Sequence, residues 1–196
     1  MKIAKPKLFS NTRDLIISLA VLAVVMVISV GFTGLCSFNP GPADREGAVQ
    51  EVDIETILKT DAQGLSVPVR LPALPDNWVP NSGRRVTVDR QPSSVAGWVI
   101  DGKEFISLTQ TDAATDRAVD AMDEKDDGIR EETGEHVTPA TASSTGKDVT
   151  WQIWTGDDAR PLWVADTGDA RLLLTGTAGD DQFATLADAV VKAQPL

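Results

Sequence analysis

The sequence predicts an α+β protein, with one transmembrane helix near the N-terminus followed by a single antiparallel sheet with helices packed against it. Three observations support this class: an uncharged run of 21 residues, several short alternating strands separated by turns, and apolar residues at helical spacing in three further segments. The expected organisation is a cytoplasmic basic tail over 1–14, the membrane helix over 15–35, a linker over 36–50 and a folded domain over 51–196.

The apolar run extends from Leu15 to Leu35 and contains no charged residue. A helix of about 20 residues crosses the hydrocarbon core of a bilayer, whereas the apolar part of a secretory signal is only about 7–15 residues long. No A-x-A cleavage site follows the run. The run therefore favours an uncleaved anchor that contacts the lipid bilayer over a cleaved signal or a buried helix of a soluble protein.

Cys36 is the only cysteine and comes directly after the run. A bacterial lipoprotein signal normally has a small residue before its cysteine, but Leu35 occupies that position. We therefore expect Cys36 to be unmodified, with lipid attachment as the alternative. A lone cysteine also means that the domain folds without an internal disulfide.

Basic residues are concentrated on one side of the run. Lys2, Lys5, Lys7 and Arg13 precede it, and no basic residue follows it until Arg45. The positive-inside rule places such an N-terminus in the cytoplasm. We therefore expect a single-pass protein of the plasma membrane whose C-terminal domain lies outside.

The folded domain begins with a helix and a proline-rich stretch. Ile54, Ile57 and Leu58 fit one face of a helix that ends at Gly64. Residues 66–85 contain four prolines, which exclude a central strand. This stretch is therefore expected to form an edge strand or an extended wrap.

Alternating apolar residues predict strands in the remainder. Asp-Gly at residues 101–102 stands between two alternating segments, which is a strong hairpin signal. Thr111 is the expected N-cap of a helix, and residues 126–148 are expected to form a loop. The expected strands are 86–88, 95–100, 104–109, 149–155, 162–166 and 170–177, and the two further helices are 112–125 and 180–192.

One predicted strand is apolar on both faces. Val149, Trp151 and Ile153 point to one side, and Trp154 points to the other. A sheet with two apolar faces needs cover on both, which three helices can provide. The order of elements resembles the PsbP-like sandwich, a likeness that concerns the fold and carries no function.

The charge of the domain limits its partners. The whole chain carries −11 and residues 1–36 carry +3, so the remaining residues carry −14. Such a surface repels the phosphates of nucleic acids and anionic lipid headgroups. We therefore expect no nucleic-acid partner, and we expect the charge mainly to keep the domain soluble.

Catalytic signals are weak. His136 is the only histidine, and the nearest serines, Ser143 and Ser144, lie in a polar run outside any nucleophile motif. A surface histidine is therefore favoured over a member of a catalytic triad, and no catalytic residue is expected.

Metal-binding signals are also weak. When Gly128 is aligned with the invariant glycine of a calcium loop, Asp123 and Asp127 take ligand positions. Lys125 then occupies the third position of the loop, where a ligand is needed, and Gly134 stands where the bidentate glutamate belongs. We therefore expect a solvated acidic loop and no metal or other cofactor.

Tryptophan offers the one candidate binding surface. All five tryptophans lie outside the apolar run, and an indole combines a large contact area with a polar handle, although in strands it usually belongs to the core. The candidates for an exposed interaction surface are Arg70, Trp78 and Trp154.

The apolar run, the exit "CSFNPGP" and the block "VPVRLPALPDNWVPNSG" (residues 67–83) together resemble an actinobacterial membrane protein family called domain of unknown function 4245. The resemblance covers most of the chain and implies a one-pass protein of the cell envelope. It implies no substrate, cofactor or catalytic residue.

Two classes of function are open at this point. The first is a non-enzymatic accessory or binding domain, held near the membrane for another envelope protein or component. The second is an extracytoplasmic hydrolase with an unrecognised active site. The sequence contains no evident catalytic constellation, which favours the first class.

Overall fold

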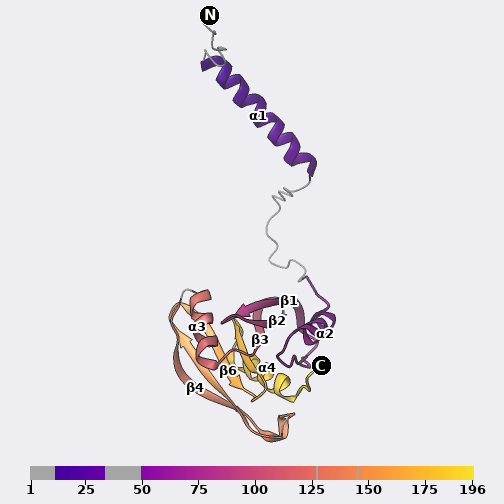
Figure 1. Cartoon of the computed structure of the whole chain (residues 1–196), viewed down its shortest axis with the longest axis vertical. Helices are drawn as coiled ribbons and strands as arrows, with labels where there is room; N and C mark the ends of the chain where they lie inside the picture. Colours follow the sequence, from indigo (N-terminus) through magenta and orange to yellow (C-terminus); the bar gives the residue numbers. More distant parts are fainter. Residues whose placement is uncertain (1–11, 34–49, 127, 145) are drawn as a thin grey trace, which may run out of the picture. The chain divides into compact units, whose positions relative to one another are not determined.

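The computed structural model describes residues 12–33, 50–126, 128–144 and 146–196 (Figure 1). The chain divides into two compact units, Met1–Arg45 and Glu46–Leu196. Cys36 and residues 36–49 of the expected linker lie outside the described residues.

The first unit contains helix α1, Thr12–Thr33. Its side chains are described over residues 15–26, and every one of these is exposed. In the described part of the chain, no helix has the length and apolarity that crossing a membrane requires.

The second unit is built on one antiparallel sheet of seven strands, in the order β1-β2-β3-β7-β6-β5-β4. Two meanders, β1 to β3 and β4 to β7, are joined where β3 pairs with β7. The strands are β1 Trp78–Val88, β2 Gln91–Ile100, β3 Glu104–Thr111, β4 Glu131–Thr138, β5 Val149–Gly156, β6 Ala159–Asp166 and β7 Arg171–Gly176. The helices are α2 Ile54–Gly64, α3 Thr115–Asp126, the short 3₁₀ helix η1 Ala140–Ala142 and α4 Asp180–Lys192.

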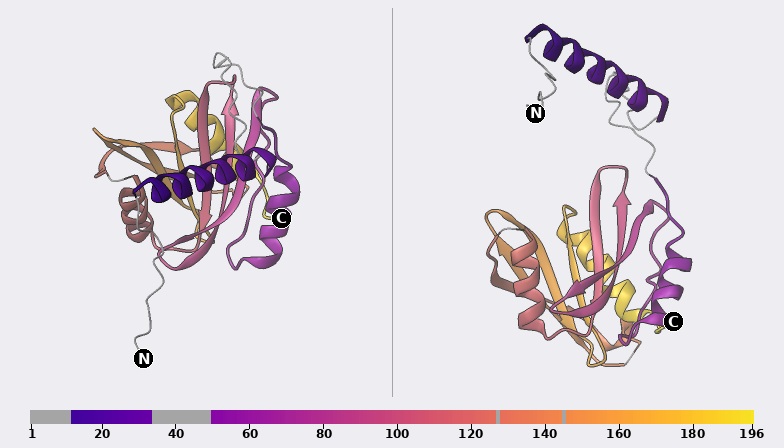
Figure 2. Two further views of the ribbon diagram at one scale, coloured as in Figure 1. Left: turned by 90° about the horizontal axis from the view of Figure 1, so that it is seen from above. Right: turned by 45° about the horizontal axis from the view of Figure 1, so that its top comes forward.

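Helices cover both faces of this sheet, and the views in Figure 2 show α3 and α4 on opposite sides of it. The larger core cluster joins one face to α2 and α4, with Trp151 and Phe183 fully buried at its centre. The smaller cluster joins the other face to α3 through Val119 and Met122. The expectation of an α+β domain with a sheet apolar on both faces is thus confirmed.

Several predicted elements occur at the predicted places. The turn between β2 and β3 has positive φ at Asp101 (50°) and Gly102 (69°), the geometry that an Asp-Gly hairpin requires. Helix α4 has the predicted bounds, and α2 ends at Gly64. Pro80 lies in β1, which is an edge strand, as proline in a sheet demands.

Two predictions about local structure were wrong. Residues 126–148 are not simply a loop, because they contain β4 and η1. The sequence of β4 has no apolar alternation, because its one apolar side chain, Val137, is exposed, even though partly buried and exposed positions alternate from Gly134 to Thr138. Thr111 does not cap a helix: it lies in β3, its hydroxyl accepts the backbone N–H of Ala113, and α3 begins at Thr115.

Buried polar side chains hold α2 on the sheet. The carboxylate of Asp61 accepts a hydrogen bond from Arg85 Nε and another from Ser94 Oγ, both at 2.6 Å. Asp53 caps the helix by accepting the backbone N–H of Thr56 at 3.0 Å, and hydrogen bonding from Thr56 lowers the pKa of the Asp53 carboxyl. Helix α2 is therefore fixed both at its N-terminus and along its contact with the sheet.

Candidate functional site

Arg70, expected at an interaction surface, lies in the wrap between α2 and β1 and is only 2% exposed. Its Nη2 donates to both carboxylate oxygens of Asp169, at 2.9 and 2.6 Å. Its backbone N–H donates to Gln110 Oε1 at 2.7 Å, and Gln110 Nε2 donates back to the Arg70 carbonyl at 2.9 Å. Arg70 thus fastens the wrap to β3 and to the turn before β7.

The two tryptophans expected beside Arg70 lie on opposite faces of the sheet. Trp78 is 7% exposed and belongs to the cluster under α2 and α4. Trp154 is half-buried and packs against the cluster under α3. The structure therefore does not bring Arg70, Trp78 and Trp154 together on one surface, because burial in the core separates them.

His136 lies in β4 and faces α4. Its ring is 5.1 Å from the ring of Trp163, and its Nε2 is 3.8 Å from Asp188 Oδ1. The same Asp188 oxygen accepts the hydroxyl of Thr138 at 2.7 Å, and Trp151 Nε1 donates to that hydroxyl at 3.2 Å. These contacts attach the edge strand β4 to α4.

The acidic segment expected to be a solvated loop is partly helical, since α3 extends to Asp126. Asp123, the first ligand in the calcium alignment, is paired with Arg130: Arg130 Nη1 is 2.6 Å from Asp123 Oδ1. Asp127 lies outside the described residues. Among the residues described, no group of three or more His, Cys, Asp or Glu side chains is placed to hold a metal ion.

The structure instead brings the end of α3 next to the turn between β5 and β6, and the segment 128–130, here named the Ile129 loop, runs between them. The Arg130 side chain is completely buried. Besides its bond to Asp123, its Nε donates to the carbonyl of Arg160 at 2.7 Å. The backbone N–H of Arg130 also donates to Asp123 Oδ2 at 3.3 Å. One arginine thus ties the Ile129 loop to both neighbouring elements.

Two glycines allow the Ile129 loop to lie this close to the hairpin. A Cβ atom at Gly156 would overlap the carbonyl oxygen of Ile129. A Cβ at Gly128 would stand 2.8 Å from the Cβ of Ala159. Any larger residue at Gly156 would push the loop away from the sheet, so close backbone approach is what these glycines provide.

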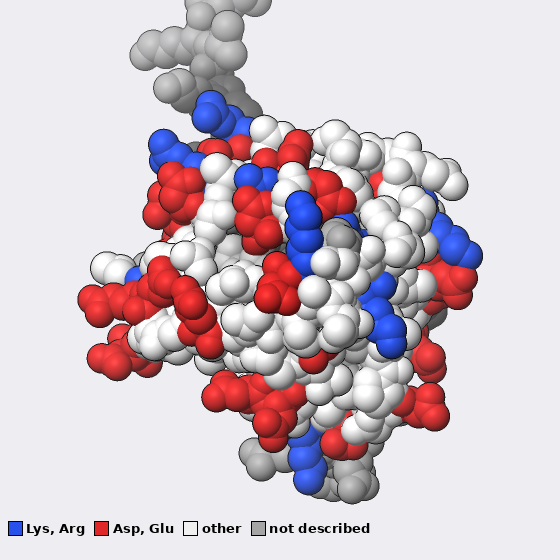
Figure 3. Space-filling model, turned by 90° about the horizontal axis from the view of Figure 1, so that it is seen from below, with Lys and Arg blue, Asp and Glu red and all other residues white. Residues whose placement is uncertain are grey.

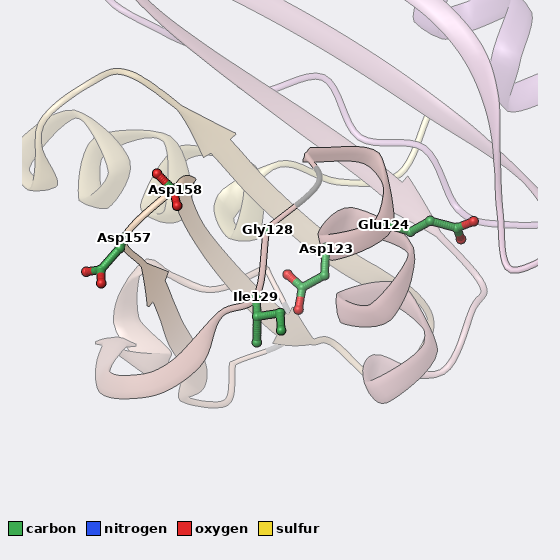
Figure 4. A pocket seen from close by; sticks show the side chains of 6 residues that line it. All are labelled: Asp123, Glu124, Gly128, Ile129, Asp157 and Asp158. Carbon is green, nitrogen blue, oxygen red and sulfur yellow. The ribbon is translucent and has the colours of Figure 1, made fainter.

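The Ile129 loop presents its central side chain to solvent. Ile129 is 84% exposed, although its neighbour Arg130 is buried. It borders a hollow of about 620 Å³, here named the acidic hollow, which is lined by Asp123, Glu124, Gly128, Ile129, Asp157 and Asp158. Figure 4 shows the Asp123 carboxylate close to Ile129, the two aspartates of the hairpin turn on the far side, and Glu124 pointing away.

The surroundings of the acidic hollow are negative. Four of the six residues that line it are aspartate or glutamate, and one of these, Asp123, is paired with Arg130. Figure 3 shows acidic side chains spread over the face of the molecule that it draws. An exposed isoleucine among carboxylates offers a partner one apolar contact and several acceptors for basic groups. Contiguous apolar patches rimmed by polar residues are typical of protein-binding surfaces, whereas single exposed apolar side chains are common on any protein.

The sequence did not point to this site. Ile129 is a single apolar residue in an acidic segment and belongs to no periodic pattern. Its exposure follows from the burial of Arg130, whose carbonyl partner is 30 positions away in the chain. The glycines of "DDG" and "WTGDD" were the only local signals, and they indicate a turn without saying what it approaches.

Comparison with models of known protein families identifies the family of this chain. A family model described as "Protein of unknown function (DUF4245)" matches residues 7–190. The chain belongs to this family. The predicted resemblance to DUF4245 is therefore confirmed, and the match includes both the α1 segment and the folded domain.

Neither the curated proteins nor the solved structures contain a match to this DUF4245 chain. The likeness to the PsbP-like sandwich stays a prediction. The actinobacterial source and the envelope location implied by the resemblance also stay predictions.

Proposed function

We propose that this DUF4245 protein is a membrane-anchored, extracytoplasmic binding domain that engages a protein partner at the cell envelope through the Ile129 loop. The anchor and the binding surface depend on different residues.

The anchor is supported by the apolar character of α1. Apolar side chains surround the helix over the described stretch, because residues that point in different directions around it are all more than half exposed: Leu15, Ile16, Ile17, Val21 and Val25. A helix that is apolar all round needs an apolar environment, either a protein core or lipid. The uncharged run continues in the sequence to Leu35, which is sufficient for a bilayer.

The orientation follows from the flanking charges. Four basic residues precede the run and none follows it before Arg45, so the N-terminus is assigned to the cytoplasm and the folded domain to the outside. Cys36 would then lie at the outer surface of the membrane, without lipid because Leu35 breaks the lipoprotein signal.

Reporter fusions test the topology. An alkaline phosphatase fused after Leu196 is expected to be active, because the enzyme requires an oxidising compartment for its disulfides. The same enzyme fused ahead of residue 15 is expected to be inactive. Activity of only the N-terminal fusion would overturn the orientation, and recovery of the full chain in the soluble fraction would overturn the anchor.

The binding role depends on one observation, the 84% exposure of Ile129 on a loop fixed by Arg130. A side chain on a loop whose backbone is fixed by buried hydrogen bonds has less conformational entropy to lose on binding, which favours its use as a contact.

A matched pair of variants tests this role. Full-length protein is cross-linked in intact cells, purified in mild detergent and compared for Ile129→Ser and for Leu196→Ser, a change at another exposed apolar residue. We expect Ile129→Ser to lose the specific cross-linked species and Leu196→Ser to keep it. Equal cross-linking by both variants and the unaltered chain would contradict the assignment of the surface.

A further inference from the structure

We propose that the open edge of β4 receives an extended basic segment of the partner as an additional strand. This inference rests on the proposed function and names the chemistry of the partner. In such pairing, main-chain hydrogen bonds provide affinity, and side chains at alternate positions provide specificity.

The two edges of the sheet differ. The segment before α2 reaches the β1 edge: the backbone N–H of Val52 donates to the carbonyl of Pro80 at 3.0 Å, and Asn81 Nδ2 donates to the carbonyl of Gln50 at 3.2 Å. The last strand in the order at the other end is β4, which pairs with β5 on one side. Within the described ranges, no backbone hydrogen bond reaches its other side.

The side chains of β4 form an acidic stripe with an apolar position. Its register with β5 places Glu132, Glu135 and Val137 on the α3 face of the sheet, opposite Trp154, Gln152 and Thr150. Val137 is 49% exposed. A strand added beside β4 would therefore meet two carboxylates and one apolar side chain on this face.

On the α4 face of the sheet, the start of β4 lies next to the Ile129 loop. Glu131 is the first residue of β4 and pairs with Thr155. Together with Ile129 and Asp157, these two residues line a second hollow, next to the acidic hollow. A segment that contacts Ile129 can thus continue along β4 without leaving the surface.

The charges decide which occupant fits. A second copy of this chain, pairing edge to edge, would bring the glutamates of one β4 against those of the other, and like charges on adjacent strands destabilise pairing. Lysine or arginine at alternate positions of a partner strand would instead complement the carboxylates.

The experiment uses full-length protein in a neutral detergent and a capped peptide, Lys-Val-Lys-Thr-Lys-Val-Lys-Thr, as the probe. Hydrogen–deuterium exchange is followed for residues 131–138, and affinity is measured by fluorescence titration. We expect the peptide to slow exchange in β4. We also expect a control peptide with alternate amides N-methylated to give no such protection, because it retains the charges but cannot form the ladder.

A matched pair of protein variants tests the role of charge. Glu132→Gln/Glu135→Gln is expected to weaken peptide binding about fivefold or more, because cross-strand charge pairs are lost. Glu51→Gln/Asp76→Asn removes the same number of charges at exposed positions outside β4 and is expected to leave the affinity nearly unchanged.

Three results would overturn the pairing: absence of protection in β4, equal binding of the N-methylated peptide, or equal weakening by both double variants. These results are separate from the cross-linking test. Loss of cross-links in Ile129→Ser together with an unprotected β4 would retain the proposed function and remove only the added strand.

Discussion

Contacts between residues distant in the sequence stabilise this domain, and those of Arg70 are the clearest case. Its Nε and Nη1 are buried without a hydrogen-bond partner among the described residues, so Asp169 is the carboxylate that compensates its charge. A buried cation is stable only when it is paired. The tie between wrap and sheet therefore depends on one half-exposed aspartate.

Asp169→Asn is expected to lower the free energy of unfolding by about 1–3 kcal/mol at neutral pH, because Arg70 would lose its counter-charge. Urea titration measures the loss. Asp76→Asn, at an exposed position, is the control and should change the free energy by less than about 0.5 kcal/mol. Equal effects of the two changes would show that Asp169 contributes nothing specific.

The same pair gives the domain an acid dependence. Burial would raise the pKa of Asp169, but the hydrogen bonds from Thr167 and Arg70 and the charge of Arg70 together outweigh it and lower that pKa. A lowered folded-state pKa stabilises the fold above the ordinary aspartate value of about 3.9, and this stability is lost as the pH falls through the folded value. Below about pH 4 the unfolding free energy of Asp169→Asn should therefore fall less steeply than that of the unaltered chain.

Gly156 is the second residue on which a site depends. Gly156→Ala is expected to destabilise the domain by about 1–3 kcal/mol, because the new methyl group would overlap the Ile129 carbonyl. Gly134→Ala is the matched control in the neighbouring strand, since the nearest atom to its Cβ would be Ile153 Cδ1 at 4.0 Å. Thermal unfolding of both variants checks the difference, and similar melting temperatures would contradict the close approach.

At the scale of elements, α4 carries much of the core. Phe183→Ala is expected to cost about 3–5 kcal/mol, because the fully buried ring leaves a cavity against Trp163. Thr185→Ala, on the exposed side of the same helix, should change the unfolding free energy by less than about 0.5 kcal/mol. A small loss for Phe183→Ala, measured by urea titration, would mean that α4 packs more loosely than described.

Elements with a strong local pattern were predictable from the sequence, and those without one were not. The spacing of Phe183, Leu186 and Val190 specified α4, and Asp-Gly at 101–102 specified the β2–β3 turn. The edge strand β4 was missed because an edge strand with exposed side chains needs no apolar alternation. Its strand conformation depends on pairing with β5, which is a tertiary effect.

The candidate site was beyond sequence reasoning for a related reason. Arg130 is buried because Asp123 and the carbonyl of Arg160 converge on it, and an arginine in an acidic segment is otherwise expected in solvent. Arg70 was expected at an interaction surface with Trp78 and Trp154, and its burial depends on Asp169 and Gln110. In both cases, partners supplied by distant segments decide the burial of a charged side chain.

At the scale of the whole molecule, the division into two units predicts that the second unit folds alone. A fragment of residues 46–196 is expected to be soluble and to unfold in one cooperative transition, since its core clusters lie wholly within it. Differential scanning calorimetry checks this. Aggregation of the fragment, or two separate transitions, would contradict an independent domain.

Calcium or EDTA is expected to leave the melting temperature of that fragment unchanged, because the Asp123 carboxylate already forms an ion pair with Arg130. A ligand that binds only the folded state must raise the melting temperature. An increase of several degrees with calcium would therefore show that the folded domain binds the ion and would contradict the expectation that it has no metal site.

The junction between the two meanders determines how the domain can fold. Each meander is assembled from neighbouring hairpins, but β3 meets β7 only across a long stretch of chain: Ser107 Oγ donates to the Thr175 carbonyl, 68 positions away. The entropy of closing so long a loop must be overcome before this pairing stabilises anything, and such non-local strand contacts make folding slow. We therefore expect the hairpins of each half to form before β3 pairs with β7, and we expect this pairing to limit the folding rate of the domain.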